Sequence, residues 1–230
     1  MTGVGDMWFE VERAAQEAET RSIAALFEDA GRAGAFSLRF DGMLLDYSKT
    51  TLDEAARDAL LRLAVASGVE ARRAAMFDGQ PINETEGRAV LHSALRNLSG
   101  GAVMVDGADI MPGIHATRAR MAGFAQEIRQ GPITDVINIG IGGSHLGPEM
   151  AVRALKPYHD GPRCHFVSNV DGADIADTLR GLDPATTLVI VASKTFSTIE
   201  TMTNAATARA WLERAGVDPG PQFAAVSSAL

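Results

Sequence analysis

The stretch that decides the fold is Thr134-Asp-Val-Ile-Asn-Ile-Gly-Ile-Gly-Gly-Ser-His-Leu-Gly-Pro-Glu-Met150. A β-branched apolar run over residues 136–141 breaks into glycines and a serine, and an apolar-periodic segment resumes at Pro148. This order predicts a strand, a tight glycine turn and a helix that begins near Pro148, where proline's missing N–H costs nothing. Glycines let a backbone approach a ligand closely, and a helix N-terminus offers unpaired N–H groups, so the turn favours an anionic or hydroxyl-rich ligand.

The glycine turn matches neither of two common nucleotide-binding patterns. Counted from Gly140, the third glycine of the dinucleotide pattern falls on His145, and Gly147 precedes Pro148 rather than the lysine of a P-loop. A strand-to-helix connection that needs glycine only for close packing is an equally good interpretation of this turn taken alone.

The β-α order then repeats to the end of the chain. Further strands are expected over residues 165–168, 187–192 and 223–227, and helices over residues 148–155, 173–182 and 198–215. The strands are β-branched and nearly continuously apolar, as buried parallel strands are. The pattern predicts an α/β fold with a doubly wound parallel sheet, which binds ligands at the carboxyl ends of its strands. Because no closing helix follows the last strand, we expect the chain to be truncated at its end.

The part before the sheet is predicted to be helical. Helices are expected over residues 9–31, 48–68, 69–77, 85–98 and 114–130, and a hairpin turns at Asp41-Gly42. Thr51 or Asp53 stands near the cap of the second helix, whose inner face includes Ala56 and Leu60. The expected domains are therefore a helical N-terminal extension with a short hairpin, residues 1–130, and an α/β domain, residues 131–230.

Composition narrows the class of protein. The formal net charge of −8 argues against nucleic acid or a membrane surface as partner. No apolar run is long enough to span a membrane, and the acidic N-terminal stretch does not resemble a signal peptide. The single cysteine, Cys164, excludes an intrachain disulfide and is expected to be a buried, inert thiol in a strand. A cytoplasmic protein fits these features.

A second group of polar residues follows the strand at 187–192. Ser193-Lys-Thr-Phe-Ser-Thr-Ile-Glu-Thr201 carries five hydroxyl side chains and one lysine just before a helix. Hydroxyls, helix N–H groups and Lys194 can hold phosphate oxygens, whereas a hydroxyl-rich helix cap is the plainer interpretation. A single cap residue would suffice for capping, so the string favours a ligand. The loop should share one sheet edge with the glycine turn, where a phosphorylated sugar could place its hydroxyls towards Gly143 and Ser144.

Several ordered segments together resemble the glucose-6-phosphate isomerase family, and the likeness extends over nearly all of the chain from about Tyr47 onward. The segments are Met76-Phe77, Glu86–Asn97, Asp106-Gly107, Met111-Pro112, Asn138–Pro148, His165–Gly172, Ala192–Thr198 and Glu200–Asn204.

The resemblance implies interconversion of glucose 6-phosphate and fructose 6-phosphate without metal or organic cofactor, by a homodimer with two sugar-isomerase domains per subunit. By motif matching, Ser193, Lys194, Thr195 and Thr198 take phosphate-binding roles, and Gly143 and Ser144 contact the sugar. Phe196 and Ser197 lie within the same loop; Ser197 replaces a usual threonine and keeps the hydroxyl. His145 stands where the family commonly has aspartate, and we expect its side chain only to cap the following helix.

No catalytic residue is assigned. An isomerase of this kind needs a base and a ring-opening acid. In the resembled family these are a glutamate and the other subunit's histidine, in motifs of the second half that this chain lacks. Glu149 and Glu200 sit at helix starts for dipole reasons, and none of the five histidines is assigned. The chain alone should therefore be inactive. The alternatives are a non-catalytic sugar-phosphate sensor and an aminosugar-phosphate isomerase or synthase.

Overall fold

The structure, a computed structural model, describes residues 3–228 and forms two compact units, Met1–Ala116 and Thr117–Leu230. The division falls inside helix α7 (Met111–Gln130), whereas the boundary expected from the sequence falls at the end of that helix. The two descriptions therefore differ in the unit to which most of α7 is assigned.

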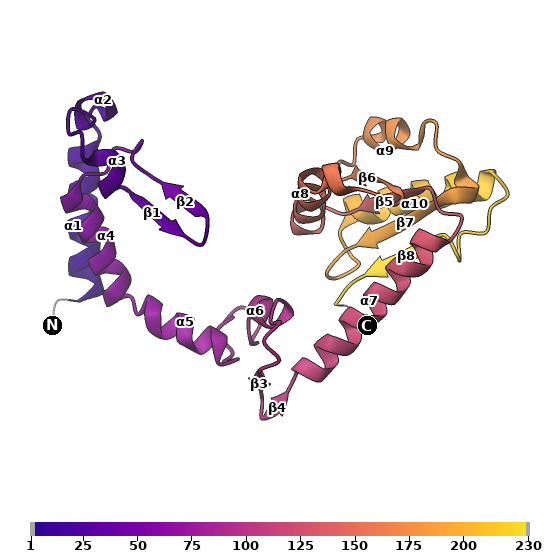
Figure 1. The fold of residues 1–230 in the computed structure, drawn as a ribbon, viewed down its shortest axis with the longest axis horizontal. Coiled ribbons are helices and arrows are strands. Elements are labelled where there is room, and N and C mark those ends of the chain that lie inside the picture. Colours follow the sequence, from indigo (N-terminus) through magenta and orange to yellow (C-terminus); the bar gives the residue numbers. More distant parts are fainter. Residues whose placement is uncertain (1–2, 229–230) are drawn as a thin grey trace. The chain divides into compact units, whose positions relative to one another are not determined.

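The first unit is mainly helical, as expected (Figure 1). Its longer helices, α1 (Val4–Ala18) and α4 (Glu54–Ala66), pack against each other. The remaining elements are short. They are α2 (Ile23–Leu26), α3 (Arg32–Ala35), α5 (Val69–Phe77), α6 (His92–Leu95) and two hairpins, β1 (Ser37–Phe40) with β2 (Met43–Asp46) and β3 (Met104–Val105) with β4 (Ala108–Asp109).

Local sequence signals account for several of these elements. The hairpin turn at Asp41-Gly42 is confirmed, with both residues at positive φ (43° and 79°) as a tight hairpin requires. Asp53 is the N-cap of α4, since its Oδ1 accepts the Ala56 N–H at 2.8 Å. The inward position given to Leu60 is wrong, because the residue is 41% exposed; Ala56, which was also expected to face inward, is buried together with Ala59.

The predicted single helix over residues 9–31 is wrong because tertiary contacts interrupt it. Helix α1 ends at Ala18, and Arg21 then turns to donate to the Thr51 carbonyl at 2.8 Å and to pair with Asp53 at 2.6 Å. Ser22 starts a new short helix as its N-cap. A pattern of apolar spacing cannot show that an arginine within it is held by another segment.

The predicted helix over residues 85–98 is also wrong, because only α6 forms there. Asn83 accepts hydrogen bonds from the Thr85 hydroxyl (2.8 Å) and the Glu86 N–H (3.3 Å), and Gly87 adopts a φ of 63°. Such local side-chain bonds compete with a helix at its first turn.

The second unit carries a four-stranded parallel sheet in the order β6-β5-β7-β8. The strands are β5 (Asp135–Ile139), β6 (Arg163–Val167), β7 (Thr187–Ala192) and β8 (Phe223–Val226), and the helices between them are α8 (Leu146–Ala154), α9 (Gly172–Leu179) and α10 (Ile199–Arg214). Short 3₁₀ turns lie at Gly142–Ser144, Lys156–Tyr158 and Pro184–Thr186. The α/β fold with a parallel sheet and a helical N-terminal extension is thus confirmed (Figure 1).

The core of this unit lies between one face of the sheet and helices α9 and α10. Alternate residues of the central strands, among them Ile137, Ile139 and Val189, are fully buried there with Ala208 of α10. Because β5 and β7 are flanked by strands on both sides, their backbones are fixed on both edges, which gives the loops that follow them a rigid base.

Strand β6 differs from expectation because it is the edge of the sheet. Its first residues are exposed, and Cys164 is exposed rather than buried. Partial burial still raises the pKa of the Cys164 thiol, so the residue is a weakly nucleophilic thiol at the surface.

Candidate functional site

The two loops singled out in the sequence lie side by side at the carboxyl ends of β5 and β7. The register pairs Ile139 with Val191, so both strands end at the same sheet edge. Gly140 shows how close the loops are: a Cβ there would lie 2.7 Å from the Ser144 carbonyl oxygen and 3.0 Å from the Ala192 carbonyl oxygen. Position 140 therefore requires glycine for close packing of one loop on the other.

The glycine turn is held from within. Gly142 adopts a φ of 57°, and Gly142–Ser144 form a 3₁₀ turn in which the Ser144 N–H donates to the Ile141 carbonyl at 3.1 Å. The side chain of Asn138 donates to the Ser144 carbonyl at 3.0 Å. A Cβ on Gly143 would meet no atom within 4 Å, so the backbone of Gly143 faces open space.

The hydroxyl loop after β7 is anchored at its start and strained at its centre. Ser193 is 4% exposed; its N–H donates to the Val226 carbonyl, and its Oγ accepts the Phe196 N–H at 3.1 Å. Phe196 has a φ of 54°, which is unusual for a bulky side chain; it costs free energy and persists only where the surrounding structure imposes it. The hydroxyls of Thr195 and Ser197 lie 2.6 Å apart.

Helix capping does not account for the hydroxyls. Thr198 occupies the N-cap of α10 but makes no side-chain cap hydrogen bond. The Ser193 hydroxyl oxygen accepts the Phe196 N–H within the loop that precedes α10, and the hydroxyls of Thr195 and Ser197 contact each other. The N-terminus of the 16-residue helix α10 thus begins directly behind a cluster of hydroxyl groups, with its positive dipole end towards them.

Two residues with structural roles in this site were not assigned one from the sequence. Asn138 supports the glycine turn, and Asn204, 2% exposed on α10, donates to the Asn169 carbonyl at 2.7 Å and so ties this helix to the loop after β6. A sequence signal was available for Asn138 alone, a polar amide inside an apolar strand, which burial permits only when the amide is hydrogen-bonded; the mixed sequence around Asn204 gives no such signal.

The expectation that the side chain of His145 caps the next helix is wrong. His145 is at the N-cap of α8 through its backbone only, and its Nε2 lies 3.0 Å from Glu149 Oε2 one helical turn on. Arg153 holds the other Glu149 oxygen at 2.6 Å, and the imidazole packs edge-on against Phe166. A carboxylate four residues ahead on the same helix face attracts the ring away from the capping position.

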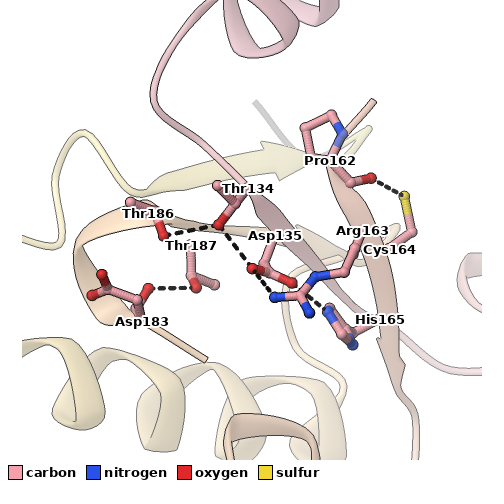
Figure 2. A network of polar contacts seen from close by, with 9 residues as sticks. All are labelled: Thr134, Asp135, Pro162, Arg163, Cys164, His165, Asp183, Thr186 and Thr187. Atoms are coloured by element: carbon pink, nitrogen blue, oxygen red, sulfur yellow. Dashed lines mark hydrogen bonds and ion pairs between the residues drawn. The ribbon is translucent and has the colours of Figure 1, made fainter. Parts of the chain in front are cut away.

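The opposite, amino end of the sheet carries a closed polar network (Figure 2). Asp135, 1% exposed, accepts hydrogen bonds from the Thr134 hydroxyl (2.9 Å) and the Arg163 guanidinium (2.8 Å), and its Oδ1 lies 2.8 Å from His165 Nε2. Burial by itself raises the pKa of Asp135, but the hydrogen bonds from Arg163, His165 and Thr134 outweigh it and bring the pKa to about 2. His165 is therefore structural.

Residues 3–228 contain neither a metal site nor a membrane-spanning helix. No group of three or more His, Cys, Asp or Glu side chains is placed to hold a metal ion, and no helix is long and apolar enough to cross a membrane.

Comparison with known proteins identifies the family. The family model described as phosphoglucose isomerase matches residues 46–230. The chain belongs to this family. It is 61% identical over 223 residues to the glucose-6-phosphate isomerase of Roseobacter denitrificans, covering 97% of this chain and 42% of that protein. It is 64% identical over 217 residues to the enzyme of the same name from Ruegeria pomeroyi, covering 91% of this chain and 40% of that protein.

A solved structure agrees with these relatives. The crystal structure of a glucose-6-phosphate isomerase from Chlamydia trachomatis superposes with a TM-score of 0.75 at 29% identity, over 90% of this chain and 44% of that one. The resemblance drawn from the motifs is thus confirmed, and the chain spans less than half the length of the relatives it matches.

Proposed function

We propose that this chain supplies the phosphate-binding half of an active site that interconverts glucose 6-phosphate and fructose 6-phosphate. The observation that carries the proposal is the contact between the two loops, where the Gly140 backbone lies against the Ala192 carbonyl. A glycine turn and a hydroxyl loop at one sheet edge, in a member of this family, fit a ligand with a phosphate at one end and hydroxyls at the other.

The phosphate group belongs at the hydroxyl loop. The hydroxyls of Ser193, Thr195, Ser197 and Thr198 can each donate to a phosphate oxygen, the N-terminus of α10 adds backbone N–H groups, and the Lys194 ammonium supplies a full positive charge. The left-handed backbone at Phe196 fits such a site, because strain of this kind is retained where the loop has to present its groups to a ligand.

The sugar belongs at the glycine turn. Because Gly143 faces open space, a hydroxyl of the substrate can reach its backbone, and Ser144 adds a side-chain hydroxyl next to it. The glycine turn and residues 193–198 of the hydroxyl loop carry no carboxylate, and Glu149, just beyond the turn, is engaged by His145 and Arg153. The proton transfer between the two sugar carbons therefore requires a base and an acid from the remainder of a longer protein.

The same proposal covers partners and location. We infer that the full-length protein works as a homodimer in which a second copy lends the acid, as the family resemblance implies, and that the reaction needs no metal or organic cofactor. A cytoplasmic location is inferred from the acidic composition and the single cysteine.

The test compares the 230-residue chain with the full-length protein. We expect the chain to bind fructose 6-phosphate in calorimetry and to convert none of it, while the full-length protein converts it. Turnover by the chain alone would refute the assignment of base and acid to the missing part. Binding without turnover by the full-length protein would favour a sensor. As a control, the 230-residue chain carrying Lys194→Ala should not bind fructose 6-phosphate.

A further inference from the structure

A cavity of about 500 Å³ lies between helix α8 and the edge strand β6, outside the loops assigned to the sugar phosphate. One wall is formed by Glu149, Val152 and Arg153 on one face of α8 and by Lys156 in the 3₁₀ turn that follows this helix. The other wall is β6, from which Arg163 and Cys164 contribute. The volume is in the range of small-molecule sites.

The charge of this cavity is opposite to that of the whole chain. The formal net charge of the protein is −8, yet three cationic side chains lie at the cavity against two carboxylates, the buried Asp135 bonded to Arg163 and one in the lining, which leaves an excess of one positive charge. The carboxylate in the lining, Glu149, is already engaged by His145 and Arg153. This cavity, called the α8–β6 cleft below, therefore has a positive electrostatic potential in an otherwise acidic protein, and a positive potential attracts anions.

The cations retain hydrogen-bond donors for a ligand. Arg153 donates to Glu149 at 2.6 Å and Arg163 donates to Asp135 at 2.8 Å. The side chain of Arg153 is 79% exposed and that of Arg163 is 68% exposed. A guanidinium has five N–H donors, so most of them face solvent. Within residues 3–228 the Lys156 ammonium has no hydrogen bond or ion pair.

We propose that the α8–β6 cleft binds a small phosphate-bearing molecule at a site separate from the proposed sugar-phosphate site. Phosphate fits better than a single carboxylate, because its three terminal oxygens can contact Lys156 and both arginines at once, whereas a carboxylate has only two oxygens and a single charge. The phosphate lies between Lys156 and the two arginines, and the rest of the ligand lies along Val152 and Phe166.

The single cysteine makes the cleft measurable. Cys164 is exposed and lines the cavity, so a neutral maleimide labels this position alone. With inorganic pyrophosphate as probe, at constant pH and constant ionic strength set with chloride, the labelling rate should fall about tenfold when pyrophosphate is about ten times its dissociation constant.

Three variants decide the assignment. Lys156→Ala should abolish the protection by pyrophosphate. Arg120→Ala, which removes the same charge from the exposed surface of α7, should leave it intact. Thr195→Ala should also leave it intact, because this residue belongs to the hydroxyl loop; loss of protection there would mean that the phosphate sits at the sugar-phosphate site and not in the cleft.

The proposal is overturned if pyrophosphate leaves the labelling rate unchanged, or if Lys156→Ala protects as well as the unchanged chain. It is equally overturned if Arg120→Ala loses protection to the same degree, since the effect would then follow net charge alone. Circular dichroism of each variant establishes that the fold is intact before labelling.

Discussion

The polar side chains at the two ends of the parallel sheet differ in whether their hydrogen-bond partners lie within the chain. At the amino end, the buried Asp135 carboxylate has all its partners inside the chain: Thr134, Arg163 and His165. At the carboxyl end, the hydroxyls of Thr195 and Ser197 contact mainly each other, Thr198 makes no cap bond, and Gly143 faces open space. A closed network stabilises the fold, whereas groups held in place without a closed set of partners are suited to a ligand.

Loss of the positive charge at the carboxyl end should have the largest effect. In the full-length protein, Lys194→Ala should lower kcat/KM for glucose 6-phosphate about 100-fold, because a charge-assisted contact with the phosphate is removed. Lys49→Ala removes the same charge from an exposed site and should leave kcat/KM unchanged. Equal activity of the Lys194 variant and the unchanged enzyme would remove this residue from the site.

The packing of the two loops predicts the next effect. Gly140→Ala forces a methyl group against two backbone carbonyls and should lower the free energy of unfolding by about 1–3 kcal/mol. Gly143→Ala meets open space and should change it by less than about 0.5 kcal/mol. Urea unfolding measures both, and similar values for the two variants would contradict the close contact of the loops.

The amino end should respond through stability alone. Asp135→Asn should cost about 2 kcal/mol of unfolding free energy at neutral pH, because the pKa of Asp135 falls from its ordinary 3.8 to about 2 on folding. A lowered carboxyl pKa stabilises the fold above about pH 4, and this contribution is lost as the pH falls towards 2.

Urea unfolding at several pH values measures that contribution. The unchanged chain should lose more stability between pH 4 and pH 2 than the Asn variant, in which the lowered pKa values of Asp46 and Asp160 remain, while fructose 6-phosphate binding at neutral pH stays the same. Weakened binding in the variant would show that the two ends of the sheet are not independent.

The smallest effect is expected at the sheet edge. Cys164→Ser should change the free energy of unfolding by less than about 0.5 kcal/mol, because the side chain is exposed on β6 and has only a 3.6 Å contact between its sulfur and the Pro162 carbonyl. A decrease of several kcal/mol in the free energy of unfolding would contradict the exposed position and would support the buried thiol expected from the apolar sequence around Cys164.

Strands, turns and caps were predictable where the information is local. The β-branched runs gave the strands, Asp41-Gly42 gave the hairpin and Asp53 gave a cap, because each depends on a few neighbouring residues. The loops of the candidate site were predictable for the same reason, since the carboxyl ends of parallel strands must meet at one edge.

Contacts between distant residues were not predictable. Arg21 ends a helical pattern because of Thr51 and Asp53, and Cys164 is exposed because β6 has a neighbouring strand on one side only. His145 turned from its expected cap to Glu149, a choice between two nearby partners that geometry decides and residue type does not.

The sequence by itself determined the class of fold, the family and the two loops that make the candidate site. The reason is that apolar periodicity, glycine turns and ordered motifs depend on residues that are close together in the sequence. Only the tertiary structure decided which strand is an edge, that Asp135 is buried with three partners, and that three cations meet in one cleft beside Cys164. The physical reason is that burial and electrostatic field are set by which segments become neighbours in space, and these neighbours are far apart in the sequence.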